Sequence, residues 1–158
     1  MIEVYKDLFV GNDRDYHAIL TSPGWFFIQA CKEPYHRQAL GYRSRGAPKT
    51  SPEYFWAERE NRLILNLVDA DDPAYIPKEV VNKAIETLKN QLPMRKVLLH
   101  CNQGRSRSPS IAFLYLVKHT KILNTDSLES ALVDFQKLYP GYDPALGVKG
   151  YIRENWRG

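Results

Sequence analysis

Residues 97–109 read VLLHCNQGRSRSP, and they decide how the rest of the chain is interpreted. The apolar run at 97–99 predicts a buried strand, and the segment from Pro109 to Lys118 predicts a helix. A loop between a strand and a helix N-terminus binds anions well, because free backbone N–H groups and the helix dipole point into it. The sequence therefore predicts an anion site that has a thiol at one end and a guanidinium at the other.

Three residues of this loop have properties suited to phosphate. Cys101 is expected to be a thiolate at neutral pH, because helix N-termini and nearby cations favour the charged sulfur. Arg107 carries a planar fork that matches two phosphate oxygens. Gly104 lies between two polar runs, where close approach of the backbone to a ligand leaves no room for a side chain. We expect the nucleophile and the oxyanion clamp to converge on one tetrahedral ligand.

The spacing Cys-x5-Arg, preceded by His100 and followed by Ser108, resembles the signature of the cysteine-dependent protein phosphatases. The Ser-Arg-Ser ending is most similar to the dual-specificity branch. Low-molecular-weight phosphatases, arsenate reductases and rhodanese-like proteins share the bare spacing, but not the whole context of strand, His-Cys, Gly, Arg-Ser and apolar helix. Residues 8–12 (LFVGN) look like the opening strand and turn of the family. The chain departs most from the small members at residues 32–61.

The resemblance assigns a role to each residue of the loop. Cys101 would attack phosphorus and form a cysteinyl-phosphate. Ser108 would donate its hydroxyl to the sulfur, or serve as the N-cap of the helix, or both. His100 would order the loop through hydrogen bonds without touching substrate. The residues expected to bind the phosphoryl oxygens are Asn102, Gln103, Gly104, Arg105, Ser106 and Arg107.

A general acid has to come from another loop, because the leaving oxygen faces away from the attacking sulfur. Asp69, Asp71 and Asp72 follow the predicted strand Leu63–Val68. Asp69 precedes Pro73 by four residues, which resembles the acid loop of the small and tensin-type phosphatases. We therefore expect Asp69 to be the general acid, with Asp72 and then Asp71 as alternatives, or else as loop caps. An acid–thiolate pair predicts a bell-shaped pH profile with a low-pH optimum.

Cys31 ends the predicted strand Trp25–Cys31. Tensin-type phosphatases carry a cysteine at a similar place that can pair with the catalytic one. Cys31 is therefore a candidate redox partner of Cys101, and the alternative is a buried structural cysteine. Lys32, His36 and Arg37 follow in the same loop and are further candidates for the pocket lining.

Strands alternate with helices along the chain, which indicates an α/β fold with a central, mostly parallel sheet flanked by helices. This is the fold that the resemblance to the protein tyrosine phosphatases also implies. The loop would then lie at the carboxyl end of a central strand. The expected strands are 2–5, 8–10, 25–31, 63–68 and 95–99. The expected helices are 12–20, 77–90, 109–118, 128–138 and 146–155, and residues 32–61 are expected to be loop with one helical turn near 52–55.

Size and composition set the remaining expectations. The 158 residues suit a single catalytic domain over 1–158, and an apolar content of 44% indicates a globular chain. No signal peptide or membrane-spanning run is recognised, and two cysteines do not form a secreted disulfide scaffold. We expect a cytoplasmic monomer. The four histidines lack metal-ligand spacing, so no metal and no cofactor are expected.

The net charge of +4 favours anionic partners. Phosphotyrosine on a protein is the expected substrate, with phosphoserine and phosphothreonine included. Phosphoinositides stay open because Arg105 adds charge to the loop, and RNA 5′-triphosphate is a substrate of another branch of the superfamily, although nucleic acid is not the expected partner. A phosphate-binding module without turnover is the alternative from another class.

Overall fold

A computed structural model describes all 158 residues and has one six-stranded sheet. Its strands are β1 (Ile2–Tyr5), β2 (Leu8–Gly11), β3 (Trp25–Gln29), β4 (Trp56–Arg59), β5 (Arg62–Leu65) and β6 (Lys96–His100). The helices are α1 (Asp13–Ile19), α2 (Arg37–Leu40), α3 (Lys78–Gln91), α4 (Arg107–His119), α5 (Leu128–Leu138) and α6 (Leu146–Asn155). Residues Lys32–His36 form a kinked segment in which Glu33 has an extended backbone, and a 3₁₀ turn covers Pro73–Tyr75. The predicted α/β class with a mostly parallel sheet is confirmed.

The sheet has the order β1-β2-β6-β3-β5-β4. The four inner strands are parallel to one another, whereas the edge strands β1 and β4 pair antiparallel with β2 and β5. Strand β6 is central, and its residues 97–99 are fully buried. A parallel strand covered on both faces is apolar without alternation, which explains the continuous run of Val-Leu-Leu. The loop that follows β6 therefore starts from the middle of the molecule.

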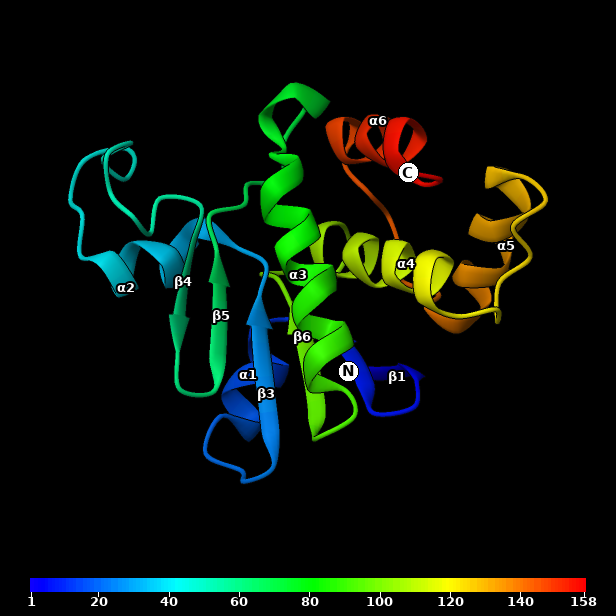
Figure 1. Cartoon of the computed structure of the whole chain (residues 1–158), viewed down its shortest axis with the longest axis horizontal. Coiled ribbons are helices and arrows are strands. Elements are labelled where there is room, and N and C mark those ends of the chain that lie inside the picture. Colours follow the sequence, from blue (N-terminus) through cyan, green and yellow to red (C-terminus); the bar gives the residue numbers. More distant parts are fainter.

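Helices cover both faces of the sheet (Figure 1). Successive residues of a strand point to opposite faces. In β3, Phe27 packs edge-on against Tyr16 of α1 at 5.1 Å between ring centroids, whereas Phe26 lies with Lys83 and Thr87 of α3. Helix α1 therefore lies on one face, and α3, which packs against α4, lies on the other. Forty-two buried residues form one continuous apolar core between these layers.

Residues 32–61 differ from the expectation of a loop. They contain α2 and the edge strand β4, which joins β5 in a hairpin across Glu60 and Asn61. Residues 52–55 form turns and a bend, so the helical turn expected there is wrong. Strand β4 reads WAER and buries only Ala57 completely, so its apolar signal is too weak for a prediction from periodicity.

Two strand ends and one helix start also differ from the expectations. Strand β3 stops at Gln29, two residues before Cys31, and β5 covers Arg62–Leu65 instead of 63–68. Helix α4 starts at Arg107, two residues before Pro109. None of the helices combines the length and the apolar composition that are needed to cross a bilayer.

Candidate active site

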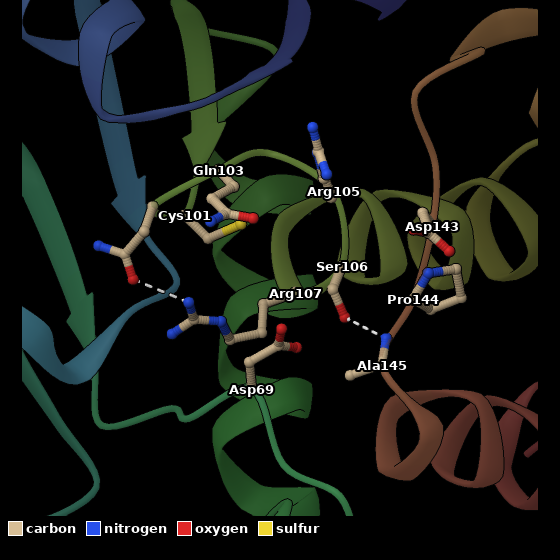
Figure 2. A pocket seen from close by; sticks show the side chains of 10 residues that line it. Asp69, Cys101, Gln103, Arg105, Ser106, Arg107, Asp143, Pro144 and Ala145 are labelled. Carbon is tan, nitrogen blue, oxygen red and sulfur yellow. Dashed lines mark hydrogen bonds between the residues drawn. The ribbon is translucent and has the colours of Figure 1, made fainter.

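The loop between β6 and α4 forms the floor of a cavity of about 400 Å³ (Figure 2). The cavity is mostly polar, and it lies at the carboxyl ends of the parallel strands, where open α/β sheets bind ligands. Its lining residues are Asp69, Cys101, Asn102, Gln103, Arg105, Ser106, Arg107, Asp143, Pro144 and Ala145. Three residues predicted from the sequence, Cys101, Arg107 and Asp69, therefore line the same cavity.

The Cys101 sulfur is buried and has two polar neighbours from the first turn of α4. The Ser108 hydroxyl lies 3.1 Å from Sγ, and the Ser108 backbone N–H donates to Sγ at 3.5 Å. The same hydroxyl lies 3.3 Å from the carbonyl oxygen of Gly11. Ser106 holds the N-cap position and Ser108 lies inside the helix, so the alternative role of Ser108 as N-cap is wrong. The hydroxyl has one proton, which it gives either to the sulfur or to the Gly11 carbonyl oxygen, whereas the backbone N–H of Ser108 donates to the sulfur and favours negative charge there.

Arg107 is held in one orientation by two neutral acceptors. Its Nη1 donates to the carbonyl oxygen of Leu67 at 3.0 Å, and its Nη2 donates to Oδ1 of Asn102 at 2.8 Å, the dashed bond at Arg107 in Figure 2. Its Nε is buried and no protein acceptor reaches it. No carboxylate of the protein pairs with this guanidinium. Its positive charge is therefore free for an anion in the cavity.

The Asn102 side chain is itself fixed by two acceptors. Its amide nitrogen donates to Oδ2 of Asp13 at 3.1 Å and to the carbonyl oxygen of Glu33 at 2.9 Å. Because both partners can only accept, the amide oxygen of Asn102 has to face Arg107. Asp13 was not a sequence candidate, because it is 89 positions from Asn102 and only the fold brings the two together.

The three candidate acids are separated by the structure. Asp69 is exposed and lines the cavity, with its carboxylate between Arg107 and Ser106 in Figure 2. Asp72 caps the 3₁₀ turn, since its Oδ1 accepts from the backbone N–H of Ala74 at 2.8 Å. Asp71 is exposed and lies outside the cavity lining. Asp69 is thus the one member of the group that faces the sulfur's cavity.

Of the four remaining residues of the loop, 103–106, three line the cavity and Gly104 does not. Gln103 lines the cavity, and Arg105 lines its rim with a side chain that extends away from Cys101 and Arg107 (Figure 2). The Ser106 hydroxyl accepts a hydrogen bond from the backbone N–H of Ala145 at 2.9 Å. Gly104 has a φ of +68°, and an added Cβ would lie 2.8 Å from the Gly11 carbonyl oxygen, so the backbone conformation and this contact both require glycine.

His100 is fully buried beneath the loop and is neutral. Arg62 donates to Oε1 of Gln29 at 3.0 Å, so the Gln29 amide nitrogen, 3.1 Å from Nε2 of His100, has to donate to it. The proton of His100 therefore lies on Nδ1, which faces the carbonyl oxygen of Cys101 at 3.4 Å. Burial lowers the pKa of His100 from 6.5 to about 4. The ring stacks on Tyr16 at 4.9 Å between centroids, so His100 is a fixed support for the loop.

Cys31 is a free, fully buried thiol, and burial raises its pKa well above the ordinary range. It follows Ala30, whose N–H donates to the carbonyl oxygen of His100 at 2.8 Å, so Cys31 and Cys101 leave neighbouring strands side by side. Cys31, Asp13 and His100 could each offer one metal-ligand atom, all within 4.8 Å of one another, a spatial grouping that the spacing of the histidines did not reveal.

That grouping is already hydrogen bonded within the protein. Asp13 accepts from the Tyr35 hydroxyl at 2.7 Å and from Asn102, and His100 accepts from Gln29. A metal held by these residues would replace the bonds that fix Asn102. Of the other candidates in this loop, Lys32 donates to Arg45, Arg37 pairs with Glu33, and the buried ring of His36 lies 3.0 Å from the Tyr42 hydroxyl, so none of the three lines the cavity.

The far wall of the cavity is Asp143, Pro144 and Ala145, which the sequence analysis missed. They lie just before α6, in the segment that closes the chain over the loop. Their polar contacts are made mainly by backbone atoms, for example the N–H of Asp143 to the carbonyl oxygen of Arg105 at 2.8 Å. Backbone contacts leave little trace in residue types, so no sequence motif pointed to them.

Several solved structures share this fold, while none of the known protein-family models matches the chain. Human DUSP28 aligns with a TM-score of 0.64 and 18% identity over 99% of this chain and 96% of its own. A leucine-rich-repeat and phosphatase-domain protein from Entamoeba histolytica aligns with a TM-score of 0.66 and 14% identity over 99% and 90% of the two chains. The human tyrosine phosphatase-like serine/threonine/tyrosine-interacting protein gives 0.63 and 19% over 98% and 93%. The chain thus has the fold of the dual-specificity phosphatases.

Proposed function

We propose that this chain is a cysteine-dependent phosphatase that hydrolyses phosphate monoesters through a cysteinyl-phosphate intermediate. One observation carries the proposal: the Cys101 sulfur, the unpaired charge of Arg107 and the Asp69 carboxylate line one polar cavity. The shared fold supports it, since the solved structures with this fold include proteins described as phosphatases. Cys101 is the nucleophile, Arg107 and the loop N–H groups hold the phosphoryl oxygens, and Asp69 is the general acid.

The reaction has two steps that these groups can carry. The sulfur of Cys101 attacks phosphorus while Asp69 gives its proton to the leaving oxygen, so an alcohol or phenol departs and a thiophosphate forms. Asp69, now ionised, takes a proton from water as the water oxygen attacks phosphorus and the sulfur leaves. Ser108 stabilises the sulfur as a leaving group in this second step. Arg107 and the loop amides stabilise the charge that develops on the equatorial oxygens.

Within this class, the proposed substrates are phosphotyrosine and, more broadly, phosphoserine and phosphothreonine. The loop ends in Ser-Arg-Ser, which is most similar to the dual-specificity branch of the phosphatases, and this similarity favours these substrates. Phosphoinositides and RNA 5′-phosphates are the alternatives, and binding of a phosphopeptide without turnover is the non-catalytic one. A panel of these compounds with the purified protein distinguishes them.

The first experiment is hydrolysis of para-nitrophenyl phosphate and its inhibition by vanadate. Cys101→Ser should abolish turnover, and Asp69→Asn should reduce it by about 10²-fold or more, the usual worth of a general acid. Asp143→Asn is the matched control, because Asp143 is the other carboxylate that lines the cavity. A larger loss in Asp143→Asn than in Asp69→Asn would reassign the acid. Wild type that binds vanadate without turnover would support the non-catalytic alternative.

We also propose that Cys31 is the redox partner of Cys101 in a reducing, cytoplasmic compartment. Peroxide would oxidise Cys101 to a sulfenic acid, and the Cys31 sulfur would attack it, forming a disulfide and releasing water. Burial raises the pKa of Cys31, so its thiolate is scarce and the attack should be slow at neutral pH.

After peroxide treatment, dithiothreitol should restore less activity to Cys31→Ser than to the wild type. Mass spectrometry of the oxidised wild type should show the Cys31–Cys101 bond. Complete and equal recovery in both proteins would make Cys31 a structural cysteine.

A further inference from the structure

Residues 143–147, here called the brace, contact both loops of the candidate site. The N–H of Asp143 donates to the carbonyl oxygen of Arg105 at 2.8 Å. The N–H of Ala145 donates to Oγ of Ser106 at 2.9 Å, the dashed line between these two residues in Figure 2. At its other end, the N–H of Gly147 donates to the carbonyl oxygen of Ala70 at 3.1 Å. Ala70 directly follows Asp69. We infer that the brace sets the position of the acid loop relative to the nucleophile loop, with Gly147 as its positioning residue.

Gly147 is pressed against the backbone of the acid loop. A Cβ built there would lie 2.4 Å from the carbonyl oxygen of Ala70, 2.5 Å from the nitrogen of Asp72 and 2.7 Å from the carbonyl carbon of Asp71. All three are backbone atoms, which cannot rotate out of the way as a side chain could. The φ of Gly147 lies outside the left-handed region, so this contact, and not the backbone conformation, is what requires glycine.

One turn further along α6, Gly150 makes a similar approach to the same loop. A Cβ at this position would lie 3.0 Å from Cγ of Pro73. Helix α6 therefore turns a face of two glycines toward residues 70–73 and packs closely on the 3₁₀ turn that ends the loop. The acid loop, residues 69–73, therefore packs on α6 and is hydrogen bonded to it through the Gly147 N–H and the Ala70 carbonyl oxygen.

This contact has a direct consequence for proton transfer, and the inference rests on the proposed function. A general acid has to come within about 2.6–3.2 Å of the oxygen that it protonates. Relief of the overlap at Gly147 would move the loop by about 1 Å, and misplacement on that scale can cost about 10²-fold in rate. The sulfur belongs to the other loop, and Arg107 is held by Asn102 and by the Leu67 carbonyl oxygen, which lies before the residues 70–72 that Gly147 contacts, so attack and anion binding would be preserved.

The test compares two substrates in Gly147→Ala. Phenyl phosphate releases a phenol as basic as a tyrosine side chain and needs the proton of Asp69, whereas 2,4-dinitrophenyl phosphate releases a stable phenolate and does not. We expect kcat/KM for phenyl phosphate to fall by about 10- to 100-fold, with the dinitrophenyl substrate within about 3-fold of wild type. Asp69→Asn should show the same selective loss, and the affinity for vanadate should stay within about 2-fold in Gly147→Ala.

Two further variants control for folding and for position. Gly150→Ala introduces a milder overlap, 3.0 Å from Cγ of Pro73 and outside the cavity, so it should give a smaller loss that is also selective for phenyl phosphate. It serves if Gly147→Ala fails to fold. Leu146→Ala changes an exposed neighbour on the same helix, and it should leave both substrates unchanged.

An equal loss on both substrates, or no loss, in Gly147→Ala and Gly150→Ala would overturn the inference while Asp69→Asn still supports the proposed function. Wild type without turnover would instead overturn the proposed function. The free energy of unfolding of Gly147→Ala tests the close contact independently of activity. Alanine in place of glycine in a helix normally stabilises a protein by up to about 1 kcal/mol, so a loss of stability would come from the contact. A Gly147→Ala protein more stable than wild type would show that the close contact does not exist.

Discussion

Asn102 and the carbonyl oxygen of Leu67 hold the guanidinium of Arg107 from two sides, at 2.8 and 3.0 Å. Neither acceptor is charged, so the pair fixes direction without neutralising the arginine. The Asp13 carboxylate accepts a hydrogen bond from the Asn102 amide nitrogen and does not pair with Arg107. The charge of Asp13 is thereby used to orient an amide, and the charge of Arg107 stays available to a phosphate.

The first prediction concerns this clamp. Asn102→Ala should weaken vanadate binding by about 10-fold or more, because a hydrogen bond to a charged group is worth about 1.5–3 kcal/mol. Titration of vanadate against turnover measures the change. Gln103→Ala truncates the neighbouring side chain, which makes no hydrogen bond to Arg107, and should have a smaller effect. If the two variants weaken vanadate equally, Asn102 has no special role in holding Arg107.

At this scale, the sequence predicted the residues whose chemistry is local. Cys101, Arg107 and Ser108 lie within eight positions, so one loop geometry determines their meeting. Asp13, Gln29 and Asp143 reach the same region from distant segments, and no spacing in the chain indicates that they meet. The positive φ of Gly104 and its contact with the Gly11 backbone are a further reason for glycine there, and the sequence alone did not reveal it.

Among the elements, the strand, loop and helix at residues 96–119 were predictable because apolar runs and helical periodicity are strong there. Strand β4 was not, since an edge strand with three partly or fully exposed residues of four has no such pattern. The position of α6 against the acid loop was equally hidden. Two glycines in a helix indicate low helix propensity in sequence, and only the packed structure shows that they allow the backbones to approach.

Over the whole molecule, the buried histidines make stability depend on pH. Burial lowers the pKa of His100 to about 4, and burial also lowers the pKa of His36. The unfolded chain therefore binds protons more readily than the folded one between about pH 4 and pH 6.5. The stability that His100 contributes is fully present above this window and is lost as the pH falls through it.

For His100, this linkage predicts a loss of about 2 kcal/mol in the free energy of unfolding between pH 7 and pH 5. Urea unfolding at the two pH values measures it in the wild type and in His100→Gln. His36 is present in both proteins, so the difference between their pH dependences isolates His100. The same dependence in both proteins would mean that His100 titrates normally in the folded state.

The edge strand β4 has a consequence for any attempt to shorten this chain. Its Glu58 pairs with Lys83 at 2.8 Å and its Arg59 pairs with Glu53 at 2.7 Å, so charged groups border the outer rim of the sheet. Behind it, residues 63–65 of β5 are almost completely buried. Deletion of β4 would expose the apolar strand β5 at the edge of the sheet, where its unpaired backbone N–H and C=O groups could pair with another molecule. We therefore expect a protein without β4 to self-associate, because β4 protects the edge of the sheet from intermolecular pairing.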